Sequence, residues 1–519
     1  MARVPTTRGD FGILDGEMEA LGSLLNGFQV ALAPINLLYA FLGVFVGTLI
    51  GVLPGIGAPA AISLLLPSTF GISPVSAIIM LSGIYYGAMY GGSTTSILVN
   101  IPGEAASVVT CLDGYQMARK GRAGPALGMA AFGSFIAGTL SLVGLMLLST
   151  PLSNAALKFG PPEYFSLMCI GLTVLIFLAQ GPILKTLQVS LLGLFLSFIG
   201  TDVIQGTARF TLGSVNLLGS VELVPLVVGI FGLSEVLLNI EQTVSRDIFE
   251  TKIKNLLPSM KDWMDSKWPI LRGTIIGFFL GILPGAGAIM ASFVSYAVEK
   301  RISKRPQMFG TGAIEGVAGP ESANNAATGS SFIPLFSLGI PTNVVLALFL
   351  GALMIHNIQP GPLLLTQHPD IFWGTVASMY IGNIMLLLLN LPLIGIWVKI
   401  LKIPYHTLFP LIILFTIIGA YSTNGSTFDI YLMMFFGVVG YVLRKLEYDI
   451  APFVFAFVIG PMLEKNLRQS LILSDGSFLI FVSRPISAVC ITVALILFFI
   501  ALMPQFGKKR KALLTEMKD

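Results

Sequence analysis

The sequence contains few charged residues. Asp, Glu, Lys and Arg make up 11% of its 519 residues, and 55% of the residues are hydrophobic. A soluble domain carries about a quarter charged residues, so this composition predicts an integral membrane protein that is solvated largely by lipid. The net charge of +4 is spread over short loops, where it orients a membrane protein, and we expect no nucleic-acid partner.

The motifs of common enzymes are also missing. The sequence has no HExxH motif, no GxSxG elbow and no GxxxxGK[ST] loop. Its three cysteines lie far apart in apolar contexts, and its three histidines form no metal-binding pattern. We therefore predict that the chain is not an enzyme, hydrolyses no ATP, and holds neither a cofactor nor a transition-metal site.

A repeated interruption of the apolar segments is present instead. The stretch LPGIGA at residues 53–58 returns as LPGAGA at residues 283–288, each time between two apolar runs. Proline removes a backbone donor and glycine relaxes the backbone, so each stretch should break a membrane helix. Lipid cannot satisfy the freed polar groups, so such a break survives only inside protein or beside a water-filled cavity. A kink that only helps helices pack is the simpler alternative, but a matching pair of breaks usually marks a transporter's binding site.

A polar run and an Ile-Pro turn follow each break. In the first half they form GGSTTSILVNIPGE, residues 91–104. In the second half they form GPESANNAATGSS, residues 319–331, and then GIPTN, residues 339–343. Both halves therefore repeat one order: a break, a short apolar segment, a polar run and an Ile-Pro turn.

The cationic residues of the loops predict how the two halves are oriented. The loop at 119–122 is basic, whereas its counterpart at 356–370 has no Lys or Arg. The reverse holds after the breaks, where 67–74 has no cation and 300–305 is basic. Because cytoplasmic loops collect Lys and Arg, equivalent loops should lie on opposite sides of the membrane. The halves should therefore be inverted relative to each other, and the basic run at 508–511 should place the C-terminus in the cytoplasm.

These features predict an all-α integral membrane protein. At about 20 residues per span, the apolar runs allow roughly ten to twelve transmembrane helices, with two inverted repeats that contain broken, re-entrant helices. The expected organisation is an N-terminal amphipathic segment at 1–28, a first inverted repeat with scaffold helices at 29–240, a cytoplasmic interfacial linker at 241–272, a second inverted repeat with scaffold helices at 273–505, and a basic cytoplasmic tail at 506–519.

The breaks and polar runs should meet near the membrane midplane and enclose a substrate site. Hydroxyls and amides can donate and accept hydrogen bonds there, and opened helix ends attract an anion. The candidate substrate-binding residues are Ser93, Thr94, Thr95, Ser96, Asn100, Pro102, Asn324, Asn325, Thr328, Ser330, Ser331, Pro341, Thr342 and Asn343. The polar runs contain no Lys or Arg, so co-transported cations would help to balance an anionic substrate. Close helix packing is the alternative explanation for such small residues.

Backbone groups at the two breaks are candidate ligands for a coupling cation, and the residues leave Na⁺ and H⁺ open. The residues concerned are Pro54, Gly55, Gly57, Pro284, Gly285 and Gly287. Glu104 and Glu321 adjoin the polar runs, where either could hold a cation or carry a proton. Next to a carboxylate substrate, either carboxylate would repel the substrate unless it were neutralised.

A channel is the main alternative to a transporter, because re-entrant loops also build selectivity filters. Channels usually repeat a filter around a pore, whereas inverted halves suit alternating access. We therefore favour a secondary transporter, and an ion or small-solute channel with re-entrant filter loops is the alternative. Saturable uptake that depends on an ion gradient distinguishes the first from the second.

Four stretches of the sequence resemble a known family. They are GVLPGIGAPAAISLLLP, YGAMYGGSTTSILVNIPGEAASVVTCLDGYQMARKGRAGPALG, GILPGAGA and GPESANNAATGSSFIPLFSLGIPTN. They are similar to the large membrane subunit of bacterial tripartite tricarboxylate transporters, the TctA family, and the similarity runs over about residues 30–500. The resemblance implies a secondary transporter driven by a Na⁺ or proton gradient, with an elevator-like movement of the domain that holds the motifs.

The same resemblance implies a substrate class, partners and a location. The substrate would be a carboxylate, either a tricarboxylate such as citrate or a dicarboxylate. The partners would be a small four-span membrane subunit and a periplasmic substrate-binding protein that delivers the substrate. The chain would then lie in the bacterial inner (cytoplasmic) membrane as a multi-pass protein.

Overall fold

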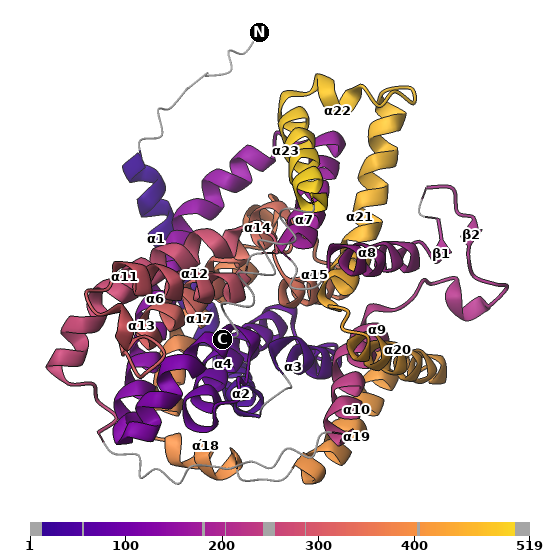
Figure 1. The fold of residues 1–519 in the computed structure, drawn as a ribbon. Coiled ribbons are helices and arrows are strands. Elements are labelled where there is room, and N and C mark those ends of the chain that lie inside the picture. The colour runs from indigo at the N-terminus through magenta and orange to yellow at the C-terminus, as the bar shows by residue number, and fades with distance from the viewer. Residues whose placement is uncertain are drawn as a thin grey trace.

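The computed structural model describes residues 13–53, 57–178, 182–202, 204–241, 255–285, 287–401 and 405–503 (Figure 1). Over these residues the chain is almost entirely helical. The exception is a small antiparallel pairing of two short strands, β1 (Gly200–Thr201) and β2 (Ala208–Arg209). The helical architecture that the composition predicts is therefore confirmed.

The helices of the first half are α1 (Ile13–Ala31), α2 (Pro34–Val52), α3 (Gly57–Leu65), α4 (Pro74–Val99), α5 (Val108–Thr110), α6 (Ala123–Ala156), α7 (Pro161–Leu178), α8 (Ile183–Ser197), α9 (Leu223–Val227) and α10 (Ser234–Glu241). Those of the second half are α11 (Met260–Ile282), α12 (Gly287–Ile302), α13 (Glu315–Ser330), α14 (Phe332–Leu338), α15 (Val344–Ile355), α16 (Leu364–Gln367), α17 (Pro369–Asn390), α18 (Ile394–Leu401), α19 (Tyr405–Asn424), α20 (Thr427–Lys445), α21 (Ala451–Leu473), α22 (Ile480–Ser483) and α23 (Pro485–Leu502). Helix α11 begins inside the range 241–272 expected as a linker, and residues 242–254 and 504–519 lie outside the described part.

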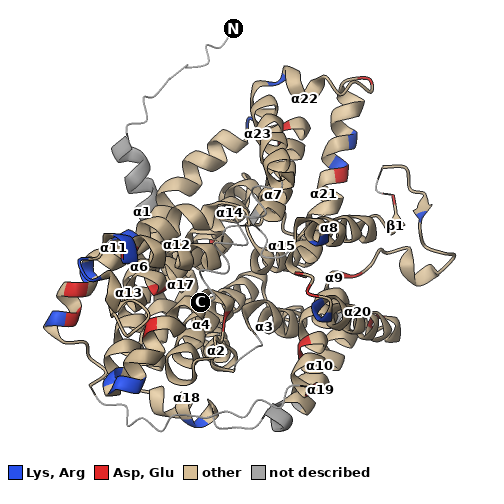
Figure 2. Cartoon of the chain, viewed as in Figure 1, with Lys and Arg blue, Asp and Glu red and all other residues tan. Residues whose placement is uncertain are grey.

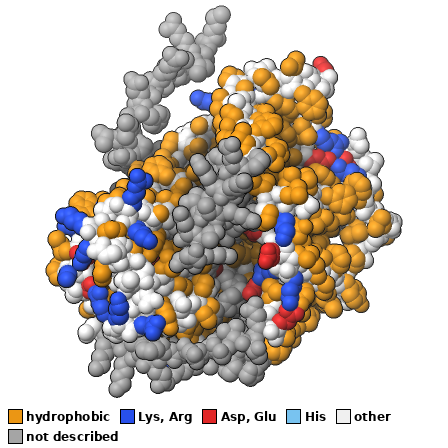
Figure 3. Space-filling model, in the orientation of Figure 1, with side chains coloured by type: hydrophobic (Ala, Val, Ile, Leu, Met, Phe, Trp, Pro, Cys, Tyr) orange, Lys and Arg blue, Asp and Glu red, His pale blue; other side chains and the backbone are white. Residues whose placement is uncertain are grey.

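Seven described helical segments are long and apolar enough to cross a membrane: Pro34–Val52, Pro74–Val99, Ala118–Ala156, Leu223–Glu241, Pro369–Asn390, Thr427–Lys445 and Pro485–Leu502. Four shorter apolar helices accompany them: Pro161–Phe177, Ile183–Ser197, Val344–Ile355 and Ile412–Ser422. Charged residues, coloured on the ribbon of Figure 2, lie mainly at helix ends and in loops, and hydrophobic side chains cover much of the visible surface (Figure 3). The chain is therefore a multi-pass membrane protein.

Each Pro-Gly stretch interrupts a helix. Leu53 and Leu283 form the C-caps of α2 and α11, and both have extended backbone. The next helices, α3 and α12, begin at Gly57 and Gly287. The breaks that the sequence predicts are therefore present in both halves, although residues 54–56 and 286 themselves lie outside the described part.

Two closely packed helix pairs flank the interruptions. Helix α2 runs parallel to α4, and α11 runs parallel to α13, and each pair meets along a row of glycines spaced four residues apart. A Cβ atom on any of these glycines would clash with a backbone carbonyl oxygen of the partner helix. We call these rows the glycine seams; they consist of Gly43, Gly47 and Gly51 on α2, and of Gly273, Gly277 and Gly281 on α11.

The two helix pairs also lead into matching turns. Asn100 (φ 56°) caps α4 and Gly339 (φ 71°) caps α14, both in the left-handed conformation. An Ile-Pro dipeptide follows each cap. Asn and Gly are the residues that adopt this conformation most readily, so the left-handed backbone at the end of α4 explains an asparagine at position 100. The repeat seen in the sequence thus extends to the backbone conformation.

The two basic loops lie on one side of the molecule. Lys120 Nζ donates to the carbonyl oxygen of Thr311 at 2.5 Å, which joins the basic loop of the first half to that of the second. Arg305 pairs with Asp265 near the start of α11 at 3.3 Å, so α12 returns to the side from which α11 enters. The shared side agrees with the prediction from the loop charges, and Figure 2 shows several blue Lys and Arg segments of the ribbon around the start of α11.

Helices α4 and α13 cross in the interior and run in opposite directions. Ser93 of α4 lies beside Glu321 of α13, with Ser93 Oγ donating to Glu321 Oε2 at 2.6 Å. Earlier on α4, the ring of Tyr85 lies 6.2 Å from the ring of Phe332, which follows α13. As α13 proceeds, it therefore meets progressively earlier residues of α4. This crossing joins the two glycine-seam pairs.

The remaining helices pack around these pairs. Helix α1 packs on α17, which also contacts α2, α4 and α6. Helices α7, α8, α21 and α23 form one neighbouring group, and α9, α10, α19 and α20 form another (Figure 1). Helix α3 contacts α9 and α19 of the second group, and Gly285 of the second interruption lies against Leu175 of α7 in the first group.

Gly277→Ala should destabilise the protein by about 1–3 kcal/mol, because overpacking a closely packed interface forces the backbones apart. The added Cβ would clash with the carbonyl oxygen of Ala323. The measurement is the free energy of unfolding or, where unfolding is irreversible, the melting temperature in detergent. Gly22→Ala is the matched control, because Gly22 is helical and has no atom within 4 Å of an added Cβ. Equal stability of the two variants would contradict a close seam.

Candidate functional site

A cavity of about 870 Å³ opens where the interruptions meet the Ile-Pro turns. Gly57 and Gly285 line it from the two interruptions, and Pro102 and Asn343 line it from the two turns. Small-molecule sites usually occupy about 300–1,000 Å³, so the cavity is large enough for a metabolite. It is built from both halves of the chain, as the sequence predicts for a substrate site.

A carboxylate occupies the first interruption. Glu104 Oε2 accepts a hydrogen bond from the backbone N–H of Ala58 at 2.9 Å, at the N-terminal end of α3. Gly57 before it has φ +64°, and a Cβ there would lie 2.9 Å from the same oxygen. The positive end of the helix stabilises the negative charge. Glycine at 57 lets the carboxylate come this close.

A backbone hydrogen bond holds the second interruption. The N–H of Gly285 donates to the carbonyl oxygen of Thr342 at 2.7 Å, which ties the break to the Ile-Pro turn of the same half. Gly285 has φ +80°, and a Cβ there would lie 2.6 Å from the Cα atom of Leu175. Helix α12 begins two residues later, and its first turn lines the cavity. Its positive end is therefore available to an anion.

Asn343 connects the second turn to the first half. Its Oδ1 accepts from the N–H of Leu346 at 3.0 Å and so caps α15. Its Nδ2 donates to the hydroxyl of Tyr85 on α4 at 3.3 Å. Both Asn343 and Tyr85 line the cavity. This wall of the cavity is thus a hydrogen-bonded contact between the two halves.

Charged side chains from other helices complete the cavity. Arg444 at the end of α20 is the one Lys or Arg among the described residues that line it, and it forms an ion pair with Glu235 of α10. Glu104, Glu447 and Asp449 line it as well. Carboxylates therefore outnumber the cation. An anionic ligand would bind here only together with cations or protons that offset this charge.

Several of the residues predicted from the sequence line the cavity, and other described ones do not. Those that line it are Pro102, Asn343, Gly57, Gly285 and Gly287. Those that are described but do not line it are Ser93, Thr94, Thr95, Ser96, Asn100, Asn324, Asn325, Thr328, Ser330, Ser331, Pro341, Thr342 and Pro284. Pro54 and Gly55 lie outside the described residues.

Some of these hydroxyls and amides have partners within the helices. Thr95 Oγ1 donates at 2.7 Å to the carbonyl oxygen of Val52, the last residue of α2 before the first interruption. Asn325 Nδ2 donates to Ser134 Oγ at 2.7 Å. Asn324 differs, because neither side-chain atom of this buried amide has a hydrogen-bond partner among the described residues. The polar runs therefore bind backbone and each other more than they face the cavity.

Sequence reasoning did not identify Arg444 or Tyr85, and it gave Glu235 an interfacial or structural role rather than a place in the site. Arg444 ends an apolar span and Tyr85 lies inside one, so neither has a local motif. A signal was available for the seams, since the glycines spaced four apart before each Pro-Gly break repeat between the halves. The charged residues of the cavity could not be predicted in this way, because their position depends on how helices far apart in the sequence pack together.

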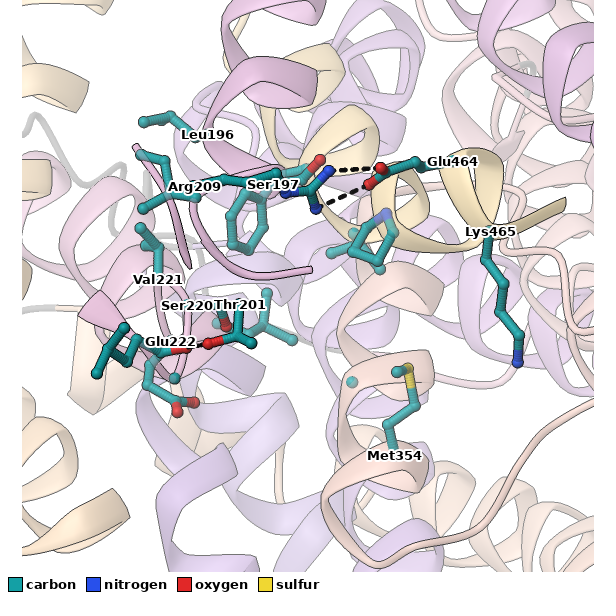
Figure 4. Close-up of a pocket in the computed structure, with 18 of the residues that line it drawn as sticks. Leu196, Ser197, Thr201, Arg209, Ser220, Val221, Glu222, Met354, Glu464 and Lys465 are labelled. Atoms are coloured by element: carbon teal, nitrogen blue, oxygen red, sulfur yellow. Dashed lines mark hydrogen bonds and ion pairs between the residues drawn. The ribbon is translucent and has the colours of Figure 1, made fainter. Parts of the chain in front are cut away.

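A second cavity, of about 380 Å³, lies between the segment that carries β1 and β2 and helix α21 (Figure 4). Arg209 makes two hydrogen bonds to Glu464, at 2.5 and 3.1 Å. Arg468 donates to Asp202 at 2.5 Å. The N–H of Gln205, followed by Arg468, lowers the pKa of the Asp202 carboxyl to about 2. These ion pairs fasten the β1–β2 segment to α21.

The helices and the larger cavity have the organisation of a membrane transport protein: several apolar spans and a ligand-sized space between interrupted helices. The chain belongs to the tripartite tricarboxylate transporter TctA family, whose model matches residues 37–455. It is therefore a subunit of a tripartite transporter, and the family is one of transporters rather than enzymes.

Two relatives from Agrobacterium vitis are about half identical to the chain. The first, described as an uncharacterized 52.8 kDa protein in the TAR-I ttuC' 3' region, is 50% identical over 499 residues, which cover 96% of this chain and 99% of that protein. The second, described as an uncharacterized protein in the TAR-II ttuC' 3' region, is 51% identical over 240 residues, which cover 46% of this chain and 99% of that protein. No solved structure matches the chain.

Asp202→Asn should loosen the β1–β2 segment at neutral pH, because it removes the charge that Arg468 and the N–H of Gln205 stabilise. The folded pKa lies below the ordinary value of 3.8, so the stabilisation is present above that value and is lost as the pH falls through about 2. The measurement is the rate of limited proteolysis at neutral pH, with Asp475→Asn on an exposed turn as the control. Equal rates for the two variants would contradict this role.

Proposed function

We propose that the chain is the translocating subunit of a binding-protein-dependent secondary transporter that imports carboxylates by symport with Na⁺ or H⁺. A periplasmic binding protein would deliver the substrate, and a small four-span membrane subunit would complete the complex. The chain would lie in the bacterial inner membrane with its C-terminus in the cytoplasm. Family membership supports the transporter class, and the cavity between the two interruptions is the single observation that carries the rest.

Alternating access is proposed on the basis of the internal repeat. The two glycine seams have the same spacing, and the two turns have the same left-handed caps. Helices α4 and α13 cross in opposite directions, which supports two copies inserted upside down relative to each other. Inverted repeats commonly enclose a central site that is exposed to each side in turn. We propose an elevator-like movement of the two seam pairs against the surrounding helices.

The substrate is proposed to be a carboxylate bound in the larger cavity. The positive end of α12, the amide of Asn343 and the guanidinium of Arg444 can each interact with a carboxylate group. Glu104, Glu235, Glu447 and Asp449 would repel it unless their charge is offset. Co-binding of a cation offsets that charge, which favours symport over passage of the anion alone. Tricarboxylates such as citrate and dicarboxylates both belong to this class.

The reconstituted complex should accumulate at least one acid from a panel of mono-, di- and tricarboxylates. The Na⁺ and pH gradients are imposed separately in proteoliposomes, with the binding protein present. Uptake should saturate with substrate and should collapse when the driving gradient is dissipated. Flux that rises linearly with substrate and ignores both gradients would favour the channel instead.

Asn343→Asp should raise the half-saturating concentration of the transported carboxylate by about tenfold or more, because it adds a negative charge beside the bound anion. The new carboxylate can still accept the hydrogen bond that caps α15, so the fold should be kept. Asn343→Ser is the matched control, since serine also caps helices and adds no charge. The measurement is the initial uptake rate against concentration, and equal values for the two variants would place the substrate elsewhere.

A further inference from the structure

Glu321 lies at the crossing of α13 with α4 and is buried, with 1% of its surface exposed. Each of its carboxyl oxygens has a hydroxyl partner. Ser93 Oγ of α4 donates to Oε2 at 2.6 Å, and Thr110 Oγ1 of α5 donates to Oε1. Distances this short are typical of hydroxyl groups bound to a carboxylate. The carboxyl group is thus held from both sides by the first half of the chain.

No cation neutralises this carboxyl group within the described part of the chain. Helices α4, α5, α6 and α14, which pack on α13, carry no charged residue. The charged groups on the other elements that pack on α13 are Lys261, Asp262, Asp265, Lys267 and Arg272 of α11, Glu299, Lys300 and Arg301 of α12, Asp113, and Glu104. Tyr90 and Cys111 are the nearby neutral titratable groups. A buried, unpaired carboxylate is costly, so Glu321 needs a proton or a cation.

Arg272 of α11, which packs on α13, pairs with another carboxylate. Arg272 donates to Glu299 at 2.8 Å through Nε, and its Nη2 lies 2.6 Å from the second oxygen of the same carboxylate. This pair shows how the same fold treats a buried acid that serves structure: it supplies an arginine. Glu321 receives hydroxyls instead. The arginine keeps the carboxyl group of Glu299 charged, whereas the hydroxyl partners of Glu321 allow its carboxyl group to change its charge.

A small void lies next to Ser93, whose hydroxyl binds the Glu321 carboxyl group, and could take part in a proton pathway. It measures about 10 Å³ and is lined by Ser93, Ser134 and the amide of Asn390, among others. The Oδ1 atom of Asn390 is buried and has no hydrogen-bond partner among the described residues. A space of this size holds about one water molecule. Hydroxyl groups can donate to a carboxylate or accept from a carboxylic acid, so the surroundings suit both states.

The carboxyl group is also connected to the larger cavity. Thr110 follows the short turn at 105–107, and Glu104 caps that turn beside the cavity. Within the turn, Ser107 Oγ donates to the carbonyl oxygen of Glu104 at 2.7 Å and accepts from Ser96 Oγ of α4 at 2.8 Å. A change at Glu321 therefore acts on a segment that lines the cavity. It also acts on the contact between the two halves.

We propose that Glu321 binds and releases the proton that drives transport. This inference rests on the proposed function and names the coupling ion. On one side of the membrane the carboxylate takes up one proton and becomes a neutral acid, while Ser93 or Thr110 turns from donor to acceptor. The crossing then moves without an unpaired charge, and the proton leaves to water on the other side. No electrons are transferred.

A proton fits the geometry better than Na⁺. Both carboxyl oxygens are already engaged by hydroxyl hydrogens, whereas a metal ion would need these oxygens to turn their lone pairs towards one common point. The void that Ser93 lines also has room for no more than one water molecule. Sodium binding at Glu321 is therefore an outcome that would overturn the proposal.

The transport test uses Glu321→Gln in the full complex, reconstituted with citrate or whichever panel acid the wild type accumulates. The amide mimics the neutral acid but cannot release a proton. Uptake driven by a pH gradient should fall by about tenfold or more, while exchange of labelled for unlabelled acid across the membrane should stay within about threefold of the wild type. Glu315→Gln, in the first turn of the same helix, where Glu315 pairs with Arg305, is the matched control and should keep both activities.

Full pH-driven accumulation by Glu321→Gln would overturn the proposal. Uptake by the wild type that requires Na⁺ would also overturn it, if Glu321→Gln changes the Na⁺ affinity. If the glutamine variant fails to assemble, Glu321→Asp is tested instead. It keeps a carboxyl group and should retain pH-driven uptake. Loss of that uptake in an aspartate variant that assembles and exchanges normally would count against the proposal.

A second measurement needs no substrate. Difference infrared spectroscopy of the purified complex between low and high pH should contain a protonated-carboxyl band that is lost in Glu321→Gln and kept in Glu315→Gln. An unchanged band in Glu321→Gln would overturn the proposal. If the wild type transports no carboxylate but this band is lost as expected, the proposed function fails while the proton site stands.

Discussion

A helix that stops inside a membrane leaves backbone groups that lipid cannot satisfy, and the fold around the two interruptions answers this constraint. The carbonyl oxygen of Val52 accepts from the hydroxyl of Thr95. The N–H of Ala58 donates to the carboxylate of Glu104, and the N–H of Gly285 donates to the carbonyl oxygen of Thr342. Each of these partners comes from the polar run or turn of the same half. The sequence motifs therefore occur together because each break needs its own polar partners.

The glycine seams explain how those partners come within reach. With no side chain at Gly47 or Gly277, the helix backbones approach closely enough for a neighbouring turn to meet the break. Broken helices, their repetition and the shared side of the basic loops could all be predicted from sequence, because proline, glycine and loop charge act locally. Arg444 and Glu235 could not, because their place in the cavity depends on the packing of α20 against α10.

The polar runs were the least precise part of the prediction. A serine or threonine on a membrane helix can satisfy a carbonyl oxygen four residues earlier, as Ser96 does with Gly92 at 3.0 Å and Thr328 with Asn324 at 2.9 Å. A sequence pattern alone does not separate such hydroxyls from those that face a ligand. The turns at the ends of the runs were more informative, because a turn must expose backbone and its flanking side chains.

The matching turns also differ in one respect. Glu104 follows Ile-Pro-Gly in the first half, and Asn343 follows Ile-Pro-Thr in the second. One side of the cavity therefore presents a carboxylate at the start of α3, and the other presents a neutral amide that caps α15, with the first turn of α12 also lining the cavity. The two sides of the cavity therefore differ in charge. Because of this difference, a ligand whose two ends carry unequal charge would bind in one orientation, with its more anionic end towards the start of α12.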